Sequence, residues 1–495
     1  MQDQLNRIAN SFEKFASKLA FCIAHRFYSY DELKKKIIII QKLIQDAGIT
    51  EHCNIGIITY DDIETYASLF AVLFSGHAFV PINPLHPAER NESIIALAKI
   101  KILLDSRNTG GIKILPSKIT QINTSIAKEA NAAFYYRELP GNQNAYILFT
   151  SGSTGVPKGV PITVSNLNSF LHAFYAQGYK IDHQDRFLQM FDMTFDLSIM
   201  SYMAPLCIGA SVYTVPFEGM KYMHVYTLFE KYEITFALLV PSILTHLRPY
   251  FDEIALKKMR YSLFCGEALY EDVVLEWAKC IPNAEIQNVY GPTEATIFCM
   301  TYDVNRNGNN KSLNGIVCIG KCMENVGAIV AGENFKHIAP LEKGELCLSG
   351  SQITPGYWTS ELKNKESFFT FEDKRYYRTG DLCFCDEEGD YFYADRLDFQ
   401  VKIQGFRVEL SEIEFHAREF LKSHAVVVHA QQNELGANQI IMFVENYKYG
   451  FEELNNYLKT KLPPYMIPAK ILSVDQFPLN ANGKVDRKAL LLTIA

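Results

Sequence analysis

Short apolar runs alternate with helical patterns through most of the chain up to residue 390, and this alternation limits the folds that the chain can adopt. Strands that alternate with helices along a sequence form layered structures, in which helices cover the faces of a sheet. We therefore predict an α/β fold with a layered N-terminal part. The runs expected to form strands include Asn54–Thr59, Ala78–Pro81, Lys101–Leu104, Ser211–Val215 and Thr235–Val240.

The length of the chain predicts more than one domain, because 495 residues are too many for a single core. A boundary is expected near Asp395–Asp398. Residues 1–396 would then form a large domain and residues 397–495 a small α+β domain. Within the small domain the pattern predicts two strands and two helices, near Phe399–Ile403, Ala425–Val428, Glu409–Phe420 and Phe451–Leu462.

Composition and charge exclude several classes of function. The net charge is −7 and the sequence pI about 6.0, so we expect no nucleic-acid partner. The apolar run Ile37–Ile40 is far too short to cross a bilayer and fits the core face of a helix through Leu43, so no membrane insertion is expected. The N-terminus lacks a signal-peptide pattern. Eleven cysteines without paired spacing predict reduced thiols in a cytoplasmic protein.

The segment Thr150–Gly159 follows the apolar run Tyr146–Phe149 and combines hydroxyl side chains, glycines and one lysine. Glycines allow a close approach of the backbone to an anion, and N–H groups and hydroxyls can then donate to phosphate oxygens. The loop is not a Walker A motif, because Pro157 precedes Lys158 and Gly159 follows it. A flexible Ser/Gly surface loop is the alternative, but the preceding strand and the stiff proline favour a polyphosphate-binding loop.

The segment Asn288–Glu294 places an aromatic ring, a Gly-Pro turn, a hydroxyl and a carboxylate in one short stretch. Tyr290 can stack on a flat base, and Thr293 can meet a phosphate. Glu294 can hold Mg²⁺ beside that phosphate, because Mg²⁺ favours carboxylate and phosphate oxygens. The alternative is a plain turn with a buried tyrosine.

Two further polar positions are candidates for the same site. Asp381 follows a glycine and can accept hydrogen bonds from both hydroxyls of a ribose, although a surface turn would look the same. Lys484 lies just past an Asn-Gly turn, where a lone lysine is usually solvated.

In their order along the chain, these motifs resemble the signatures of the adenylate-forming superfamily. That superfamily includes acyl-CoA synthetases, luciferases and the adenylation domains of nonribosomal peptide synthetases. The resemblance runs from residue 10 to residue 490 and implies a large N-terminal domain, a small mobile C-terminal domain and an active site between them. It also implies ATP and Mg²⁺ as cofactors, and catalysis by positioning and charge neutralisation.

The resemblance also implies roles for individual residues. Glu294 would be the metal ligand, Asp381 the ribose contact and Asp398 the hinge about which the small domain turns. The family usually has a glycine before the arginine that matches Arg396, whereas this chain has Asp395. The implied nucleotide-binding positions are Thr150, Ser151, Gly152, Ser153, Thr154, Gly155, Lys158, Tyr290, Gly291, Thr293, Asp381 and Arg396.

The resemblance changes the interpretation of Lys484 most. The matching lysine swings into the site and bridges the carboxylate and the phosphate during adenylation, where its charge stabilises the in-line transfer. Together with Thr150, Glu294 and Arg396 it makes up the expected catalytic group. Arg396 and Asp381 would serve both half-reactions, and Lys484 only the first.

Asp196 is the main indication of the substrate. A carboxylate among apolar neighbours needs a partner, because burying it unpaired is costly. An internal salt bridge is one alternative, and a substrate ammonium is the other. In amino-acid-activating members of the family the matching aspartate binds the α-amino group, so Asp196 favours an amino acid. The other expected substrate contacts are Leu197, Met200, Cys265 and Val289.

The segments around Phe195–Met200 and Leu263–Glu267 are similar to those of the D-alanine–carrier-protein ligases of teichoic acid D-alanylation. In those enzymes the cysteine matching Cys265 helps to choose the D hand. D-Alanine is therefore the expected substrate. Because no carrier domain is recognised after Lys484, we expect a separate phosphopantetheinylated carrier protein as the acceptor, with Gly405 lying where its arm approaches.

Three other functions remain open at this point. A stand-alone adenylation enzyme of peptide or metabolite assembly would activate another amino acid. An acyl-CoA synthetase would use CoA as the acceptor, although such enzymes generally lack the residue that matches Asp196. A non-catalytic binding protein could retain the fold, but the full set of polar motif residues argues against it.

Overall fold

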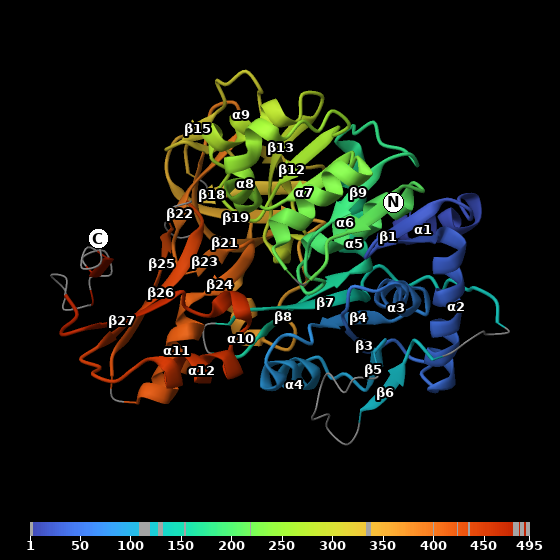
Figure 1. The fold of residues 1–495 in the computed structure, drawn as a ribbon, viewed down its shortest axis with the longest axis horizontal. Coiled ribbons are helices and arrows are strands. Elements are labelled where there is room, and N and C mark those ends of the chain that lie inside the picture. Colours follow the sequence, from blue (N-terminus) through green and yellow to red (C-terminus); the bar gives the residue numbers. More distant parts are fainter. Residues whose placement is uncertain are drawn as a thin grey trace.

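The structure is a computed structural model of the chain. It describes residues 3–107, 119–126, 132–152, 155–217, 219–332, 338–398, 400–422, 424–433, 436–478, 485 and 490–491. Figure 1 shows the green segments stacked above the blue and teal ones, with the orange and red C-terminal segments beside both. The molecule thus combines a large layered α/β part with a smaller C-terminal domain, as the sequence predicts.

The first layer is a six-stranded sheet. Its strands are β3 (Asn54–Ile58), β4 (Ala78–Ile82), β5 (Ile102–Asp105), β6 (Thr120–Asn123), β7 (Asn144–Thr150) and β8 (Lys158–Thr163). The strand order is β6-β5-β3-β4-β7-β8, and all neighbours are parallel except β7 and β8. β3 and β4 are buried along their whole length, as expected for parallel strands that are covered on both faces. The β7–β8 hairpin holds the predicted phosphate loop at its tip.

The second layer is a nine-stranded sheet in the order β17-β14-β13-β12-β11-β9-β10-β1-β2. Its strands are β1 (Leu19–Ile23), β2 (Arg26–Ser29), β9 (Arg186–Gln189), β10 (Ser211–Thr214), β11 (Phe236–Leu239), β12 (Tyr261–Phe264), β13 (Glu285–Tyr290), β14 (Met300–Asp303) and β17 (Lys321–Cys322). The central strands from β13 to β10 are parallel. Asp196, Cys265 and Tyr290 therefore follow or end neighbouring parallel strands, at the sheet edge where ligands usually bind.

Helices pack against these two sheets and share one large core with them. They are α1 (Gln4–Lys14), α2 (Tyr30–Asp46), α3 (Ile63–Phe74), α4 (Ala88–Leu97), α5 (Val164–Ala176), α6 (Leu197–Cys207), α7 (Lys221–Tyr232), α8 (Pro241–Leu247) and α9 (Glu271–Cys280), with short 3₁₀ turns η1 (Arg248–Glu253) and η2 (Thr293–Ala295). α2 begins at a capping box, in which the Ser29 and Glu32 side chains accept hydrogen bonds from each other's backbone N–H groups. Its buried face includes Ile37 and Ile40, as the sequence predicts.

A third, antiparallel sheet completes the large domain. It runs β18-β19-β21-β20, with β22 added beside β21, and a two-stranded β15–β16 pair lies nearby. The bounds are β15 (Ser312–Leu313), β16 (Ile316–Val317), β18 (Val326–Ala331), β19 (Gly344–Gly350), β20 (Phe368–Phe371), β21 (Lys374–Cys385) and β22 (Tyr391–Arg396), and helix α10 (Glu361–Ser367) precedes β20. β22 ends at Arg396, which pairs in register with Asp381.

The small domain has its own core, formed by residues between Ile403 and Met466. Its elements are β23 (Gln400–Ile403), β24 (Phe406–Glu409), α11 (Leu410–Leu421), β25 (Val426–Gln432), β26 (Asn438–Glu445), α12 (Glu452–Lys461), η4 (Pro464–Met466) and β27 (Lys470–Val474). β23 pairs with β24, and the other strands form a sheet in the order β25-β26-β27. The two strands and two helices predicted here are all present, with ends that differ by one to four residues.

None of the helices in the described part of the chain is long and apolar enough to cross a membrane. All eleven cysteines are described, and none forms a disulfide. Both observations agree with the expectations from sequence.

Candidate active site

The phosphate loop begins at the end of β7 and returns along β8. Ser151 is buried, and Lys158 at the start of β8 is partly exposed. Gly152 is required here, because a Cβ atom at this position would lie 2.0 Å from the carbonyl oxygen of Val156. The predicted loop residues Ser153 and Thr154 lie outside the described part of the chain. The hairpin therefore gives the loop a fixed base, as the buried strand in the sequence predicts.

Glu294 lies in the 3₁₀ turn η2 directly after β13. Its side chain is almost fully buried, and the Tyr357 hydroxyl donates a hydrogen bond of 2.6 Å to its Oε1 atom. Burial alone would raise the pKa of this carboxyl, but the nearby charge of Arg407 and hydrogen bonds hold the pKa below its usual value. Gly291 precedes this turn, and a Cβ atom there would lie 2.4 Å from the Phe298 Cα atom. Glu294 is therefore an ionised carboxylate inside the protein.

The predicted ribose contact, Asp381, faces the predicted base contact. The Tyr290 hydroxyl donates a hydrogen bond to one oxygen of Asp381, and Arg396 Nη1 donates to the other at 2.7 Å. Arg396 also binds both oxygens of Asp398, at 2.8 and 2.6 Å. One arginine thus joins the carboxylate expected at the ribose to the residue expected at the hinge.

Asp196 lies at the N-terminus of α6 and is only 3% exposed. Burial raises the pKa of its carboxyl to about 7, opposed by a hydrogen bond from the Thr293 side chain. Among the described residues no lysine or arginine forms an ion pair with it, and Lys402 of the small domain is the cation whose charge lowers its pKa. The internal salt bridge considered from sequence is therefore absent from the described residues.

The other predicted substrate contacts line the same sheet edge. Leu197 and Met200 are buried on α6, and Val289 is buried in β13. Cys265 directly follows β12, and burial raises the pKa of its thiol to about 12, with the charge of Asp196 adding to the effect. A thiol with so high a pKa is a small apolar contact and a poor nucleophile. These side chains form the apolar surroundings that a small side chain would need.

The small domain docks onto this site through its β24 strand. Arg407 Nη1 donates to both oxygens of Glu294, at 3.0 and 3.2 Å. Ser151 Oγ donates to the Arg407 carbonyl oxygen at 2.8 Å and accepts a hydrogen bond of 3.2 Å from the Glu409 amide. The predicted phosphate and metal positions therefore contact the small domain in this arrangement.

Two carboxylates of the small domain reach the phosphate loop. Glu409 Oε1 lies 3.0 Å from Lys158 Nζ. Glu412 binds the Gly152 amide at 3.0 Å and the guanidinium of Arg90 on α4 at 2.6 Å. Sequence patterns gave no sign of these contacts, because acidic residues at the start of a helix are already explained by the helix dipole.

A glycine of the small domain lies against the substrate side. The Gly405 amide donates to Glu267 Oε1 at 3.0 Å, and a Cβ atom at Gly405 would lie 2.5 Å from Val240 Cγ1. The neighbouring Phe406 ring packs on Phe195, with centroids 5.5 Å apart. A cavity of about 240 Å³ opens beside these rings and is lined by both domains, including Lys221, His246 and Gln404. Gly405 thus lies at the inner end of a passage between the domains.

The structure brings together most of the predicted site residues, but Lys484 falls outside the described residues. Its described neighbour Val485 packs against the face of the β25-β26-β27 sheet that carries Ile441 and Phe443. Figure 1 shows β27 on the side of the small domain away from β7 and β8. Functional candidates that the sequence did not reveal are Arg90, Lys402, Arg407, Glu409 and Glu412.

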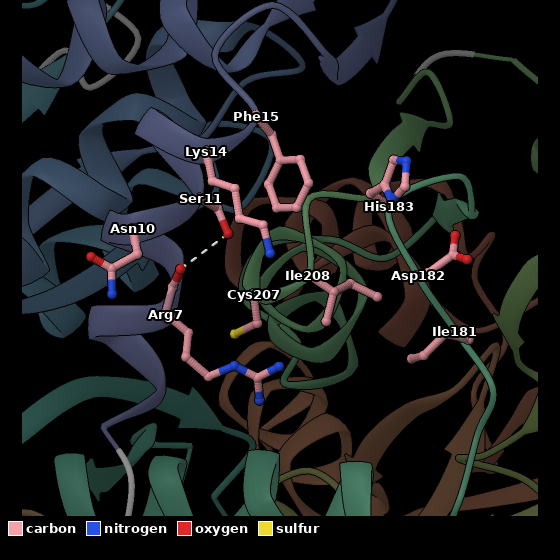
Figure 2. A pocket seen from close by; sticks show the side chains of 10 residues that line it. All are labelled: Arg7, Asn10, Ser11, Lys14, Phe15, Ile181, Asp182, His183, Cys207 and Ile208. Carbon is pink, nitrogen blue, oxygen red and sulfur yellow. Dashed lines mark hydrogen bonds between the residues drawn. The ribbon is translucent and has the colours of Figure 1, made fainter.

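A separate surface hollow of about 400 Å³ lies between α1, the end of α6 and the segment 181–183 (Figure 2). Figure 2 shows Arg7 and Cys207 on its floor, with Phe15 and His183 on its rim. The Cys207 thiol donates to the Gln4 carbonyl oxygen, and burial raises its pKa to about 12, so it is no nucleophile. None of the motif residues lines this hollow.

No group of three or more His, Cys, Asp or Glu side chains in the described ranges could hold a metal ion by itself. Mg²⁺ needs fewer protein ligands, because it is usually held by one or two carboxylates together with substrate phosphates. Glu294 beside the hydroxyl of Thr293 fits that donor set.

Two family models match the chain. Residues 8–358 match the model of the AMP-binding enzymes, and residues 420–484 match that of the AMP-binding enzyme C-terminal domain. The chain is 28% identical over 502 residues to the D-alanine–D-alanyl carrier protein ligase of Bacillus licheniformis, covering 98% of this chain and 99% of that protein. It is 30% identical to the same ligase of Bacillus cereus strain G9842, covering 94% of each.

The chain is also 29% identical to a linear gramicidin synthase of Brevibacillus parabrevis over 97% of its length. It spans only 9% of that protein, and 44% of tyrocidine synthase 1 from the same organism.

Solved structures share the whole fold. The adenylation domain AlmE of Vibrio cholerae, in complex with glycyl-adenosine-5'-phosphate, matches with a TM-score of 0.88 at 24% identity, over 100% of this chain and 98% of that one. The o-succinylbenzoate CoA synthetase of Bacillus subtilis matches with a TM-score of 0.84 at 18% identity, over 98% of each chain. By both family models and by its fold, the chain belongs to the AMP-binding, adenylate-forming enzymes.

Proposed function

We propose that this protein activates a small amino acid, with D-alanine as the leading substrate, and transfers it to the phosphopantetheine thiol of a separate carrier protein. The first step would make aminoacyl-AMP and pyrophosphate from the amino acid and ATP. The second would make the aminoacyl thioester and release AMP. The family supplies the adenylating chemistry, and the substrate and the acceptor are the parts proposed here.

The observation that carries the proposal is the state of Asp196. This carboxyl is buried at the edge of the parallel strands, close to Thr293, without an ion-pair partner from the described part of the large domain. A buried carboxylate without a cation is costly, and a substrate ammonium would supply the missing charge. A fatty or aryl acid has no such group.

Size and hand of the substrate are supported by the neighbouring side chains and by relatives. Leu197, Met200, Cys265 and Val289 are all buried and leave the site apolar. Two relatives with near full-length coverage are named D-alanine–D-alanyl carrier protein ligases. D-Alanine is therefore the best-supported amino acid, with glycine and other small amino acids next.

In the first step, one oxygen of the amino acid carboxylate attacks the α-phosphorus of ATP, and the bond to the β-phosphate oxygen breaks to release pyrophosphate. Thr150, Lys158 and the rest of the phosphate loop would hold the leaving phosphates, with Tyr290 and Gly291 at the base and Asp381 at the ribose. Arg396 and Lys484 would neutralise the charge that develops between carboxylate and phosphate.

Glu294 would hold the Mg²⁺ that accompanies ATP. When bound, the ion neutralises the phosphates as the α-phosphorus is attacked. In the docked arrangement, Arg407 binds both oxygens of this carboxylate. That arrangement therefore suits a step that follows the departure of the metal and pyrophosphate.

In the second step, the carrier's thiol sulfur attacks the aminoacyl carbonyl carbon, the bond to the phosphate oxygen of AMP breaks, and the thiol proton is lost. We propose that the docked arrangement serves this step, with residues 397–495 turning about Asp398 to reach it. The passage beside Gly405 and Phe406 opens between the domains, as an acceptor arm would need.

The test is amino-acid-dependent ATP–pyrophosphate exchange, run with D-alanine, L-alanine, glycine, serine and a set of fatty and aryl acids. The expected result is exchange with D-alanine above all other compounds. Exchange with a different amino acid would keep the mechanism but move the protein to peptide or metabolite assembly, as its similarity to a linear gramicidin synthase would allow. Exchange only with acids that lack an amino group would overturn the role given to Asp196 and favour an acyl-CoA synthetase.

A further inference from the structure

Glu412 occupies the phosphate loop with its carboxylate. One oxygen accepts a hydrogen bond of 3.0 Å from the Gly152 amide, and the other lies 2.6 Å from Arg90 Nη1. Both side chains are nearly inaccessible, with 5% of Arg90 and 0% of Glu412 exposed. A main-chain amide of the loop and a buried guanidinium therefore hold the same anion.

Glu409 repeats this contact at the other side of the loop. Its Oε1 atom lies 3.0 Å from Lys158 Nζ, and Gln400 Nε2 donates to the same oxygen at 2.5 Å. Glu409 and Glu412 are three residues apart at the start of α11, so both point toward the loop.

Carboxylates and phosphates are recognised by the same groups. Guanidinium, ammonium and loop N–H groups donate charge-assisted hydrogen bonds to either anion. The described donors of the loop are therefore paired with carboxylates where the phosphates of ATP would be expected.

Arg90 has its ion-pair partner in the other domain. It lies in the first turn of α4, where the helix dipole disfavours a cation. Among the described residues, Glu412 is the acid with which it forms an ion pair. If the small domain turned away, a buried guanidinium would lose its anion beside the phosphate loop, which is strongly unfavourable unless another anion replaces it.

We propose that Arg90 and the Gly152 amide form one anion site that Glu412 and a phosphate of ATP occupy in turn. This inference rests on the proposed use of ATP and adds a phosphate-binding residue, Arg90, that the sequence motifs do not contain. Glu412 is then a positioning residue, which holds the small domain in its docked arrangement by standing in for a phosphate. The docked small domain and the bound triphosphate exclude each other.

Exclusion has a quantitative consequence. When only the undocked fraction of the protein can take the triphosphate, its apparent affinity is reduced by that fraction. Weakening the docked arrangement should therefore tighten the binding of a triphosphate, whereas AMP, which lacks the outer phosphates, should be much less affected.

The test measures binding of α,β-methylene-ATP, which cannot be adenylated at the α-phosphate, and of AMP, by calorimetry on the full chain. Glu412→Gln keeps the shape of the side chain but removes the competing charge, so the ATP analogue should bind severalfold more tightly. Arg90→Gln removes a donor to the phosphate, so the analogue should bind about tenfold more weakly, the effect of one charge-assisted hydrogen bond. Both variants break the same ion pair, and yet they should act in opposite directions.

Arg248→Gln is the matched control, because it removes a paired arginine of the large domain far from the phosphate loop in sequence and should change neither affinity. Thermal melting shows that each variant is folded. If both variants tighten the analogue, Arg90 is only a docking contact and the shared site is wrong. If Glu412→Gln leaves the analogue's affinity unchanged, or if AMP shifts as much as the analogue, competition for the site is likewise wrong.

The outcome is separable from that of the proposed function, because no amino acid takes part in the measurement. A protein that fails to exchange pyrophosphate with any amino acid can still bind the analogue and show the opposite shifts. Conversely, strong exchange with D-alanine combined with parallel shifts would support the function and overturn the shared anion site.

Discussion

The Arg407 guanidinium binds both carboxylate oxygens of Glu294 across the junction between the large and the small domain, at 3.0 and 3.2 Å. Glu294 is only 1% exposed at its side chain, so this contact satisfies a buried negative charge. The carboxylate that we assign to Mg²⁺ is thus neutralised by the protein itself when the small domain is docked. The two half-reactions should therefore differ in their need for metal.

Removal of Mg²⁺ should separate the two steps. With EDTA in excess, amino-acid-dependent pyrophosphate exchange should be lost, because Glu294 and the phosphates would lack their shared cation. Transfer from added aminoacyl-AMP to a thiol should continue at close to the normal rate, because Arg407 takes over the carboxylate. Equal loss of both steps would show that the metal is also needed in the docked arrangement.

Asp196→Asn should abolish amino acid activation while leaving the protein folded. Loss of a buried ammonium–carboxylate pair of about 3 kcal/mol corresponds to at least about 100-fold in kcat/KM for the amino acid. The KM for ATP should change little. Asp303→Asn, at an exposed carboxylate on β14, is the matched control. A variant at Asp196 with normal exchange would remove the basis for an amino acid substrate.

The affinity for the amino acid should depend on pH through Asp196. Burial raises the pKa of this carboxyl to about 7, so in the free enzyme it is ionised above that pH and neutral below it. Because only the ionised form attracts an ammonium group, KM for the amino acid should rise about tenfold for each pH unit below 7 and level off above it. Exchange rates measured from pH 5.5 to 8.5 would show this, and a KM that is flat over this range would contradict it.

Gly405→Ala should impair transfer more than adenylation. The Gly405 backbone has φ of +85°, and an added Cβ atom would lie 2.5 Å from Val240 Cγ1, so the docked arrangement would be strained. Overpacking of about 1–3 kcal/mol would slow transfer roughly tenfold or more. Gly436→Ala is a close control, because Gly436 also has φ of +85° but has open space around it. Equal slowing of both steps by Gly405→Ala would argue against this arrangement as the transfer state.

Lys484→Ala should have the opposite selectivity. Losing one cation at the developing charge should reduce adenylation by about 100-fold or more. Transfer from added aminoacyl-AMP should be retained, because this lysine is proposed to serve only the first step. Lys470→Ala, at an exposed position on β27, is the control. Full adenylation by the Lys484 variant would contradict its assignment.

The fold could be predicted from local patterns because these patterns report burial. The run that predicted β7 is buried along most of its length, and the alternating strands and helices form the expected layers. The helix with Ile37 and Ile40 on its buried face is likewise present as α2. In each case the apolar side chains lie close together in sequence, so the core is visible in the local pattern.

The contacts between the domains could not be predicted in the same way. Arg90 and Glu412 are 322 residues apart, and each reads as an ordinary charged residue near a helix start. Arg407 likewise gave no sign that it would meet Glu294 from another domain. Such pairs depend on how two separate cores are placed against each other, which a single sequence does not encode in local periodicity.

The most direct test of the proposed function is the product itself. The full chain is incubated with ATP, Mg²⁺ and D-alanine, together with a phosphopantetheinylated carrier protein or with CoA, and the acceptor is analysed by intact mass spectrometry. The proposed function predicts a D-alanyl thioester on the carrier, lost in Asp196→Asn, and little or none on CoA. A CoA thioester of an acid without an amino group, formed while the carrier stays unloaded, would contradict it.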